Sequence, residues 1–224
     1  MNRQRIHLAL IRHGKTQNNL EGRFCGRSDY PLVPEGEDFI RELVARYPYP
    51  EPQAIFVSPA ARCVRTAQLS FPGREFEIVE DLQELSFGEY EERFAREIWD
   101  VPALAQGWGQ QLPEFAFPGG ETIGACRDRG IRVLRWILTR AAEEGWDQVA
   151  VVSHSVLISA TLKSLLRVLP EDRYALFCPN GMGIGAAVPE GEALAERPLE
   201  YLGHLPAGAP IPDMRNNPYS KKTP

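Results

Sequence analysis

The chain has 224 residues, with 25 Lys and Arg residues against 30 Asp and Glu residues, so its formal net charge is −5. Hydrophobic residues make up 43% and charged residues 25%, which is typical of a globular protein and excludes a disordered or collagen-like chain. The acidic balance argues against a general nucleic-acid binder, because such a protein needs a basic footprint to displace counterions.

Short apolar runs alternate along the chain with longer segments of helical periodicity. We expect strands at residues 6–11, 54–57, 75–79, 148–152, 183–188 and 199–202. We expect helices at residues 36–47, 60–69, 123–144 and 156–169. This alternation predicts an α/β fold with a mainly parallel sheet that helices cover on both faces.

Two segments depart from this alternation. The stretch from about residue 89 to 118 is interpreted as an insertion that lies over another part of the fold. It is rich in aromatic side chains: Tyr90, Phe94, Trp99, Trp108, Phe115 and Phe117. From Leu205 onward the chain contains five prolines, which do not sustain regular structure. The sequence therefore predicts a single domain over residues 1–204 and a flexible or draped tail over residues 205–224.

The sequence shows no signal for membrane insertion or secretion. An apolar stretch of about 18 residues is absent, and the first residues lack an apolar core followed by a cleavage site. The four cysteines are Cys25, Cys63, Cys126 and Cys178. They lie far apart and form no C-x-x-C pair, which argues against a disulfide framework or a zinc site. We therefore expect a cytoplasmic protein.

Residues whose side chains can take part in catalysis follow the expected strands. They lie at the sheet edge where ligands bind in α/β folds. They are Arg12 and His13, Arg62, Glu84, and His154. Two guanidinium and two imidazole groups in one cavity repel one another unless an anion lies among them, and phosphate fits that environment. Helix N-termini after Ser58 and His154 are expected to add backbone donors for the same anion.

His13 is the best candidate for a nucleophile. The chain has no P-loop, no G-x-S-x-G motif, no deaminase-type zinc motif and no paired-Asp metal motif. Imidazole is largely neutral near pH 7, so attack of His13 on phosphorus would give a phosphohistidine that water hydrolyses. Glu84 would donate the proton to the leaving group, and Arg12, Arg62 and His154 would stabilise the phosphoryl oxygens. We expect this mechanism to need no metal ion and no cofactor.

Short motifs that contain these residues follow one another in order: LIRHGKT (10–16) with Asn19, SPAARCVRTA (58–67), LQELSFGEYE (82–91), PGGET (118–122), VVSH (151–154) and Asn180-Gly181. The set, from about residue 6 to 190, resembles the histidine phosphatase superfamily, the phosphoglycerate mutase-like proteins. The resemblance implies a single three-layer α/β/α domain with His13 as the phosphorylated residue. It implies that Arg62, rather than Arg65, is the second arginine and that Glu84 is the proton donor.

The resemblance also suggests which residues contact phosphate or substrate. We expect this role for Asn19, Cys25, Gly26, Arg27, Ser155, Asn180 and Gly181. For Cys25 an inert packing role remains the alternative. Lys15 and Ser155 depart from the residues usual in the family after R-H-G and V-S-H, and neither departure removes a catalytic group.

The resemblance leaves the substrate open, because the family contains phosphatases and mutases. A mutase is expected to have a basic cap, whereas residues 88–92 are acidic and the rest of the insertion is apolar and aromatic. We therefore expect a hydrolase of small phosphomonoesters whose other end is neutral or ring-like. The run from Arg12 to Asp29 resembles bacterial α-ribazole phosphatases.

Several alternatives stay open. They are a broad-specificity phosphatase, a cofactor-dependent phosphoglycerate mutase and a non-catalytic phospho-ligand binder. We expect neither nucleic acid nor membrane as a partner, and we leave a homodimer open.

Overall fold

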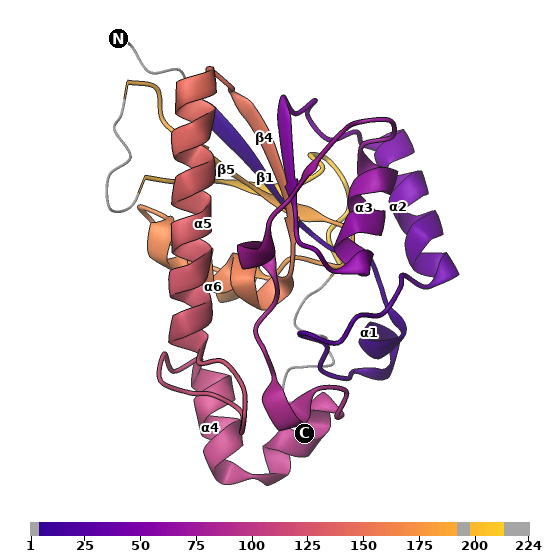
Figure 1. The fold of residues 1–224 in the computed structure, drawn as a ribbon, viewed down its shortest axis with the longest axis vertical. Coiled ribbons are helices and arrows are strands. Elements are labelled where there is room, and N and C mark those ends of the chain that lie inside the picture. The colour runs from indigo at the N-terminus through magenta and orange to yellow at the C-terminus, as the bar shows by residue number, and fades with distance from the viewer. Residues whose placement is uncertain (1–4, 192–197, 213–224) are drawn as a thin grey trace.

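The computed structural model describes residues 5–191 and 198–212. Six strands form one sheet in the order β3-β2-β4-β1-β5-β6 (Figure 1). Their bounds are Ile6–Arg12 (β1), Ala54–Val57 (β2), Glu77–Ile78 (β3), Gln148–Ser153 (β4), Gly183–Val188 (β5) and Glu200–Leu205 (β6). Strands β1 to β4 run parallel, β5 is antiparallel to β1, and β6 is antiparallel to β5. The expected mainly parallel sheet is confirmed, with an antiparallel addition at one edge.

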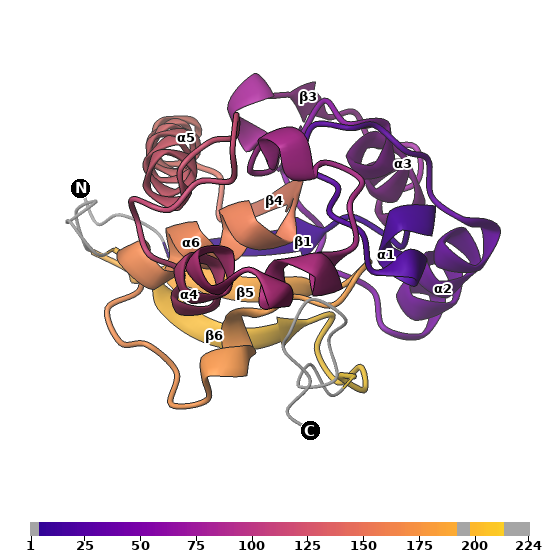
Figure 2. The same cartoon turned by 90° about the horizontal axis from the view of Figure 1, so that it is seen from below.

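Helices form the two outer layers. Their bounds are Gln17–Glu21 (α1), Pro34–Arg46 (α2), Ala61–Ser70 (α3), Pro102–Gln110 (α4), Ile123–Glu144 (α5) and Ser155–Leu165 (α6). Helices α2 and α3 lie on one side of the sheet, and α5 and α6 lie on the other (Figures 1 and 2). None of the helices in the described part of the chain is long and apolar enough to cross a membrane.

The central strand β1 shows why the sheet is covered on both faces. Successive side chains of a strand point to opposite faces. Leu8 and Leu10 join a buried cluster with apolar residues of α5 and α6. Ala9 and Ile11 join a second cluster with apolar residues of α3. A strand without polar alternation therefore lies between two hydrophobic cores, as parallel sheets require.

Several expected bounds were wrong. The strand expected at residues 75–79 comprises only Glu77–Ile78, and the helix expected to reach residue 169 ends at Leu165. The chain leaves helix α6 because Leu199 donates its N–H to the Leu165 carbonyl at 3.0 Å, while Arg167 donates to the Leu199 carbonyl at 2.9 Å. Helices α1 and α4 were not expected.

The aromatic insertion forms a cap that contains α4 and two 3-10 turns, Gly88–Tyr90 and Ala95–Asp100. In Figure 1, α4 lies at the lower end of the molecule, the same end as α1, which follows β1. Phe24 stacks on Phe87 with ring centroids 4.6 Å apart, and Trp108 lies 5.5 Å from Phe117. All four rings are buried. Trp108 and Phe117 of the insertion therefore fill the core of the cap.

The chain remains in contact with the domain beyond residue 204. Leu205 is the last residue of β6, and Ala209 packs into the hydrophobic core with 8% exposure. The chain therefore stays attached to the domain at least as far as Ala209. The rest of the expected tail, residues 213–224, lies outside the described residues.

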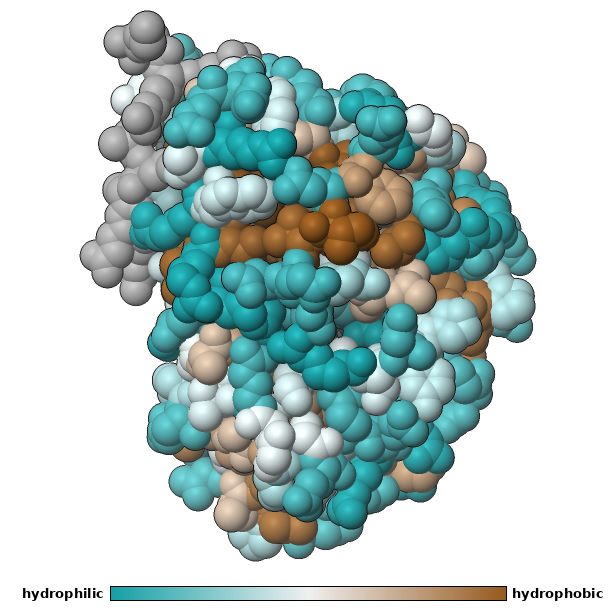
Figure 3. All heavy atoms as spheres, viewed as in Figure 1, coloured by the Kyte–Doolittle hydropathy of each residue, from teal (hydrophilic) through white to brown (hydrophobic). Residues whose placement is uncertain are grey.

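The edge of the sheet at β3 is short and carries a charged pair. Glu77 accepts a hydrogen bond from Arg140 of α5 at 2.5 Å, and the Arg140 guanidinium also lies 5.6 Å from the Trp136 ring. On this face of the molecule hydrophobic residues form a band across the middle, with hydrophilic residues above and below it (Figure 3). Short length and charge at an edge strand oppose pairing with another sheet.

Candidate active site

His13 follows the last residue of β1 and is buried, with 3% exposure. Its backbone N–H donates to the Ser153 carbonyl at 3.0 Å, which continues the pairing of β1 with β4. Its Nδ1 atom lies 2.7 Å from the Gly14 carbonyl. A carbonyl only accepts, so Nδ1 carries the proton and Nε2 keeps its lone pair. The local backbone thus selects the tautomer that a nucleophile needs.

His154 follows β4, the neighbour of β1, so both imidazoles lie at one edge of the sheet. Their ring centroids are 5.3 Å apart. His154 Nε2 lies 2.8 Å from Ser58 Oγ, and its Nδ1 lies 3.3 Å from Arg62 Nη2. Because a guanidinium only donates, Nδ1 accepts and Nε2 carries the proton.

Arg62 is fully buried in the first turn of α3. Its Nη1 donates to the Ser28 carbonyl at 2.7 Å, and its Nη2 donates to the Gly26 carbonyl at 2.7 Å. Arg12 Nη1 donates to the Cys178 carbonyl at 3.0 Å. These bonds fix both guanidinium planes beside the imidazoles.

Two buried donors at this edge have no partner. Within residues 5–191 and 198–212, neither Nε of Arg12 nor Nε of Arg62 makes a hydrogen bond. A buried unpaired donor costs free energy, and charged donors cost more. An anion that accepts from both would remove that cost, and phosphate has the oxygens to do so.

Burial and positive charge keep both histidines neutral. Burial lowers the pKa of His13 well below its ordinary value of 6.5, and Arg62 and Arg12 lower it further. Burial likewise lowers the pKa of His154 well below 6.5, with Arg62 as the next largest cause. A neutral His13 is competent to attack an electrophile near pH 7.

Glu84 joins this group through helix α6. Its Oε1 accepts from the N–H of Leu85 at 2.9 Å and of Leu157 at 3.0 Å, and its Oε2 accepts from the N–H of Val156 at 3.1 Å. Burial raises the pKa of Glu84 above its ordinary value, while these backbone N–H groups act in the opposite direction. The carboxyl therefore lies next to His154 in an environment that favours its protonation.

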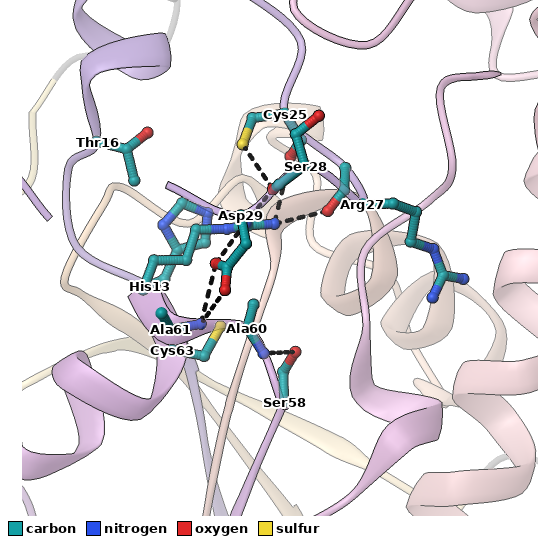
Figure 4. Close-up of polar contacts among 12 residues, drawn as sticks. His13, Thr16, Cys25, Arg27, Ser28, Asp29, Ser58, Ala60, Ala61 and Cys63 are labelled. Atoms are coloured by element: carbon teal, nitrogen blue, oxygen red, sulfur yellow. Dashed lines mark hydrogen bonds and ion pairs between the residues drawn. The ribbon is translucent and has the colours of Figure 1, made fainter. Parts of the chain in front are cut away.

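The expectation that helix N-termini supply phosphate donors was wrong for the N–H groups seen here. The Ala61 N–H at the start of α3 donates to the Asp29 carboxylate at 3.0 and 3.1 Å, as Figure 4 shows. The N–H groups of Val156 and Leu157 at the start of α6 donate to Glu84. Two protein carboxylates thus take the positions that the sequence assigned to an anion.

Asn19, Asn180 and Gly181 hold the His13 segment. Asn19 Oδ1 accepts from the Thr16 N–H at 3.1 Å and from Asn180 Nδ2 at 3.0 Å. Asn180 Nδ2 also lies 3.2 Å from the His13 carbonyl, and the Gly181 N–H donates to the same carbonyl at 3.0 Å. The structure brings all three to the site, where they support the backbone of the nucleophile.

The substrate-binding candidates of the 25–29 loop, Cys25, Gly26 and Arg27, each contact different parts of the protein. The Cys25 carbonyl lies 3.5 Å from Arg62 Nη2, and its thiol faces the Ser28 carbonyl at 3.4 Å. The Gly26 N–H donates to Glu91 at 2.9 Å. The Arg27 side chain extends away from His13 (Figure 4) and contacts Gln83 and Glu121. Ser155 begins α6 and is partly exposed.

Sequence reasoning missed three supporting residues, Thr66, Glu91 and Arg129. Thr66 Oγ1 accepts from the Gly14 N–H at 2.8 Å and donates to the Arg62 carbonyl at 2.7 Å. Thr66 and Glu91 lie at the ends of two of the motifs quoted above, which was the available signal. Arg129 gave no signal, because its position in α5 looks like a solvated helix face.

No three His, Cys, Asp or Glu side chains in the described ranges gather so as to hold a metal ion. Two guanidinium groups and two neutral imidazoles meet at the ends of β1 and β4, with a buried carboxyl beside them. This arrangement suits transfer of an anionic group to an imidazole.

Known proteins are similar to this chain in sequence and in fold. The adenosylcobalamin/alpha-ribazole phosphatase of Escherichia coli is 27% identical over 168 residues, covering 72% of this chain and 79% of the relative. Phosphoserine phosphatase 1 of Hydrogenobacter thermophilus is 25% identical over 179 residues, covering 78% and 83%. The crystal structure of phosphoglycerate mutase from Thermus thermophilus matches with a TM-score of 0.66 at 30% identity, covering 89% of this chain and 98% of that one.

A family model supports the same conclusion from the sequence. The model of the histidine phosphatase superfamily (branch 1) matches residues 8–183, a range that contains all five candidate catalytic residues. The chain belongs to the histidine phosphatase superfamily.

Proposed function

We propose that the protein is a phosphomonoester hydrolase with His13 as nucleophile and a phosphohistidine as intermediate. One observation supports this most directly. A neutral His13 with its Nε2 lone pair available lies among two buried guanidinium Nε donors that have no partner within the described ranges. A phosphoryl group would accept from those donors while its phosphorus faces the nucleophile.

The reaction has two steps. In the first, Nε2 of His13 attacks phosphorus, an N–P bond forms, and the bond from phosphorus to the leaving oxygen breaks. Glu84 gives its proton to that oxygen. In the second, Glu84 accepts a proton from water as the water oxygen attacks phosphorus, and His13 leaves with its electron pair. The products are an alcohol and inorganic phosphate, and both residues return to their starting states.

The remaining charged groups stabilise the transferring phosphoryl group. The guanidinium groups of Arg12 and Arg62 would stabilise the negative charge that accumulates on the equatorial oxygens. A bound phosphate dianion would raise the pKa of His154, because an opposite charge favours the protonated imidazole. No step of this scheme uses a metal ion, so we propose that hydrolysis proceeds without one.

The test is hydrolysis of p-nitrophenyl phosphate and of a panel of alkyl phosphates, with EDTA present. Turnover that persists in EDTA supports the proposal. An enzyme that is inert across the whole panel contradicts it and favours the non-catalytic phospho-ligand binder.

For the physiological substrate we propose α-ribazole phosphate. Support comes from the run Arg12–Asp29 and from the similarity to the Escherichia coli phosphatase. The aromatic insertion adds little support, because two of its rings, Trp108 and Phe117, are buried in the cap. A panel of α-ribazole phosphate, phosphoserine, phosphoglycerates and sugar phosphates tests the choice. A kcat/KM for α-ribazole phosphate at least about tenfold above the others supports it, whereas a flat profile indicates a broad-specificity phosphatase.

Phosphoglycerate mutase activity is the second candidate, because the Thermus thermophilus structure carries that name. The basic residues of the cap are arranged against aromatic rings, with Arg96 4.1 Å from the Phe94 ring and Arg93 5.0 Å from the Tyr90 ring. Conversion of 3- to 2-phosphoglycerate that depends on 2,3-bisphosphoglycerate would favour the mutase over the hydrolase.

A further inference from the structure

Glu91 is a partly buried carboxylate that accepts five hydrogen bonds. Its Oε2 accepts from the Gly26 N–H at 2.9 Å, from Ser28 Oγ at 3.2 Å and from the Ser28 N–H at 3.4 Å. Its Oε1 accepts from the N–H of Arg27 at 2.9 Å and of Phe87 at 3.0 Å. Three successive backbone N–H groups of the 25–29 loop thus point at one carboxylate.

The opposite side of the same loop faces Arg62. The carbonyls of Gly26 and Ser28 each accept from Arg62 at 2.7 Å. The loop therefore lies between a carboxylate that takes its N–H groups and a guanidinium that donates to its carbonyls. Hydrogen bonds to charged groups are the stronger ones, and they polarise the peptide units between them.

The arrangement continues from Arg62 to the reacting groups. Arg62 Nη2 lies 3.3 Å from His154 Nδ1, and its unpaired Nε is buried at the site. A cation that binds a phosphoryl group is effective only if its donors are held in the required orientation before the anion arrives. The loop carbonyls provide that orientation, and Glu91 fixes the loop.

We propose that Glu91 is a positioning residue that acts through the 25–29 loop to orient the Arg62 guanidinium for the phosphoryl group. The final Glu of the segment LQELSFGEYE (82–91) then has a role distinct from that of Glu84, seven residues earlier. Glu84 donates and accepts the proton of the reaction, whereas Glu91 raises the affinity of the site for the anion. The part of this inference that concerns turnover rests on the proposed function.

A purely structural role for Glu91 would lower the amount of folded protein and leave the affinity of the folded fraction unchanged. The dissociation constant for inorganic phosphate does not depend on that amount. We therefore measure it by isothermal titration calorimetry on the full chain, together with KM and kcat. The test variant is Glu91→Gln, whose amide NH2 would face loop N–H donors. Glu91→Asp, which keeps the charge on a shorter stem, replaces it if the amide variant fails to fold.

The matched control is Glu89→Gln, an exposed carboxylate on the 3-10 turn Gly88–Tyr90, which Glu91 directly follows. We expect Glu91→Gln to weaken phosphate binding about tenfold or more and Glu89→Gln to leave it unchanged. We expect the ratio of kcat/KM between good and poor leaving groups to stay at its wild-type value, because Glu84 is untouched.

A double variant tests whether the effect passes through Arg62. Arg62→Ala should itself weaken phosphate binding, and adding Glu91→Gln to it should weaken binding no further, because the group being oriented is gone. Wild-type affinity in Glu91→Gln, or the same fold-loss on the Arg62→Ala background, would overturn the inference. So would a wild-type protein that does not bind phosphate. A wild type that binds phosphate but hydrolyses nothing contradicts the proposed hydrolase and leaves this binding test decisive.

Discussion

The Oε1 atom of Glu84 lies 3.0 Å from the backbone nitrogen of Leu157, in the first turn of helix α6. This contact joins the segment after β3 to the helix after β4. It places the candidate proton donor beside His154, which precedes α6. The carboxyl is held by backbone N–H groups, so its position depends on main-chain geometry rather than on a flexible partner.

The first prediction concerns Glu84→Gln. The amide cannot supply a proton, so substrates with poor leaving groups should lose the most activity. We expect kcat/KM for an alkyl phosphate to fall about 10²- to 10⁴-fold, with a much smaller loss for p-nitrophenyl phosphate, whose leaving group needs little protonation. Steady-state kinetics on both substrates checks this. Equal losses on the two substrates would remove Glu84 from the role of acid.

Arg129 should also affect the difference in kcat/KM between alkyl phosphates and p-nitrophenyl phosphate, although it acts through the segment that carries Glu84. Its Nη1 donates to the carbonyls of Asp81 and Gln83 at 2.7 Å, and its Nη2 lies 3.3 Å from the Glu84 carbonyl. It also pairs with Glu121 at 2.9 Å. Arg129→Met would release the segment that carries Glu84, so we expect about a tenfold loss or more that is larger for alkyl phosphates than for p-nitrophenyl phosphate.

The matched control for Arg129 is Arg132→Met, an exposed arginine on the same helix. It should leave both activities at the wild-type level. Breaking a buried ion pair can cost about 3–5 kcal/mol of stability, so Arg129→Lys provides a second variant that keeps the charge. A uniform loss on both substrates in each folded Arg129 variant would argue against a positioning role.

Acid should destabilise the protein through its buried histidines. The pKa values of His13 and His154 are well below 6.5 in the folded state, so the unfolded state binds more protons as the pH falls below 6.5. The stability contributed by the neutral imidazoles is present above that pH and is lost below it, at up to about 1.4 kcal/mol per pH unit for each histidine.

Urea unfolding at about pH 7.5 and about pH 5.5 measures this loss. In His154→Gln one of the two titrating groups is absent, so the free energy of unfolding should fall less steeply with acid. An unchanged slope in that variant would contradict the link between His154 burial and acid sensitivity.

A pair of glycines should respond in opposite directions to alanine. A Cβ on Gly26 would lie 2.1 Å from the Leu85 carbonyl oxygen, which is backbone and cannot easily move. Gly26→Ala should therefore displace the 25–29 loop, weaken phosphate binding and lower the melting temperature. A Cβ on Gly109 in helix α4 would meet the Trp99 ring at 3.5 Å, an ordinary contact. Gly109→Ala should stabilise the protein by up to about 1 kcal/mol, which thermal unfolding would detect.

The sequence predicted the sheet and the meeting of His13 with His154 because both depend on local signals. Short apolar runs mark the strands, and parallel strands bring the residues after them to one edge. His13 and His154 follow β1 and β4, which are neighbours, so their meeting needed no knowledge of side-chain contacts.

The sequence could not predict contacts between segments that are distant in the chain. Phe24 packs on Phe87 and Phe117, so rings from segments that are distant in the chain form one buried cluster. Asp29 and Glu84 accept from N–H groups at helix N-termini, and these contacts also join segments that are distant in the chain. A carboxylate from another segment competes with any anion for such N–H groups. Arg27 pairs with Glu121, which is distant in the chain, and no spacing rule predicts that contact.

Trapping the covalent intermediate shows directly whether His13 carries the phosphoryl group. The wild-type protein is mixed with excess phosphomonoester, quenched within one turnover in alkali, where phosphohistidine survives, and digested for mass spectrometry. We predict one phosphoryl group on the peptide that contains His13, with its position assigned to the imidazole, and none on that peptide in folded His13→Asn. A phosphoryl group on another residue, or turnover in His13→Asn at the wild-type rate, would exclude His13 as the nucleophile.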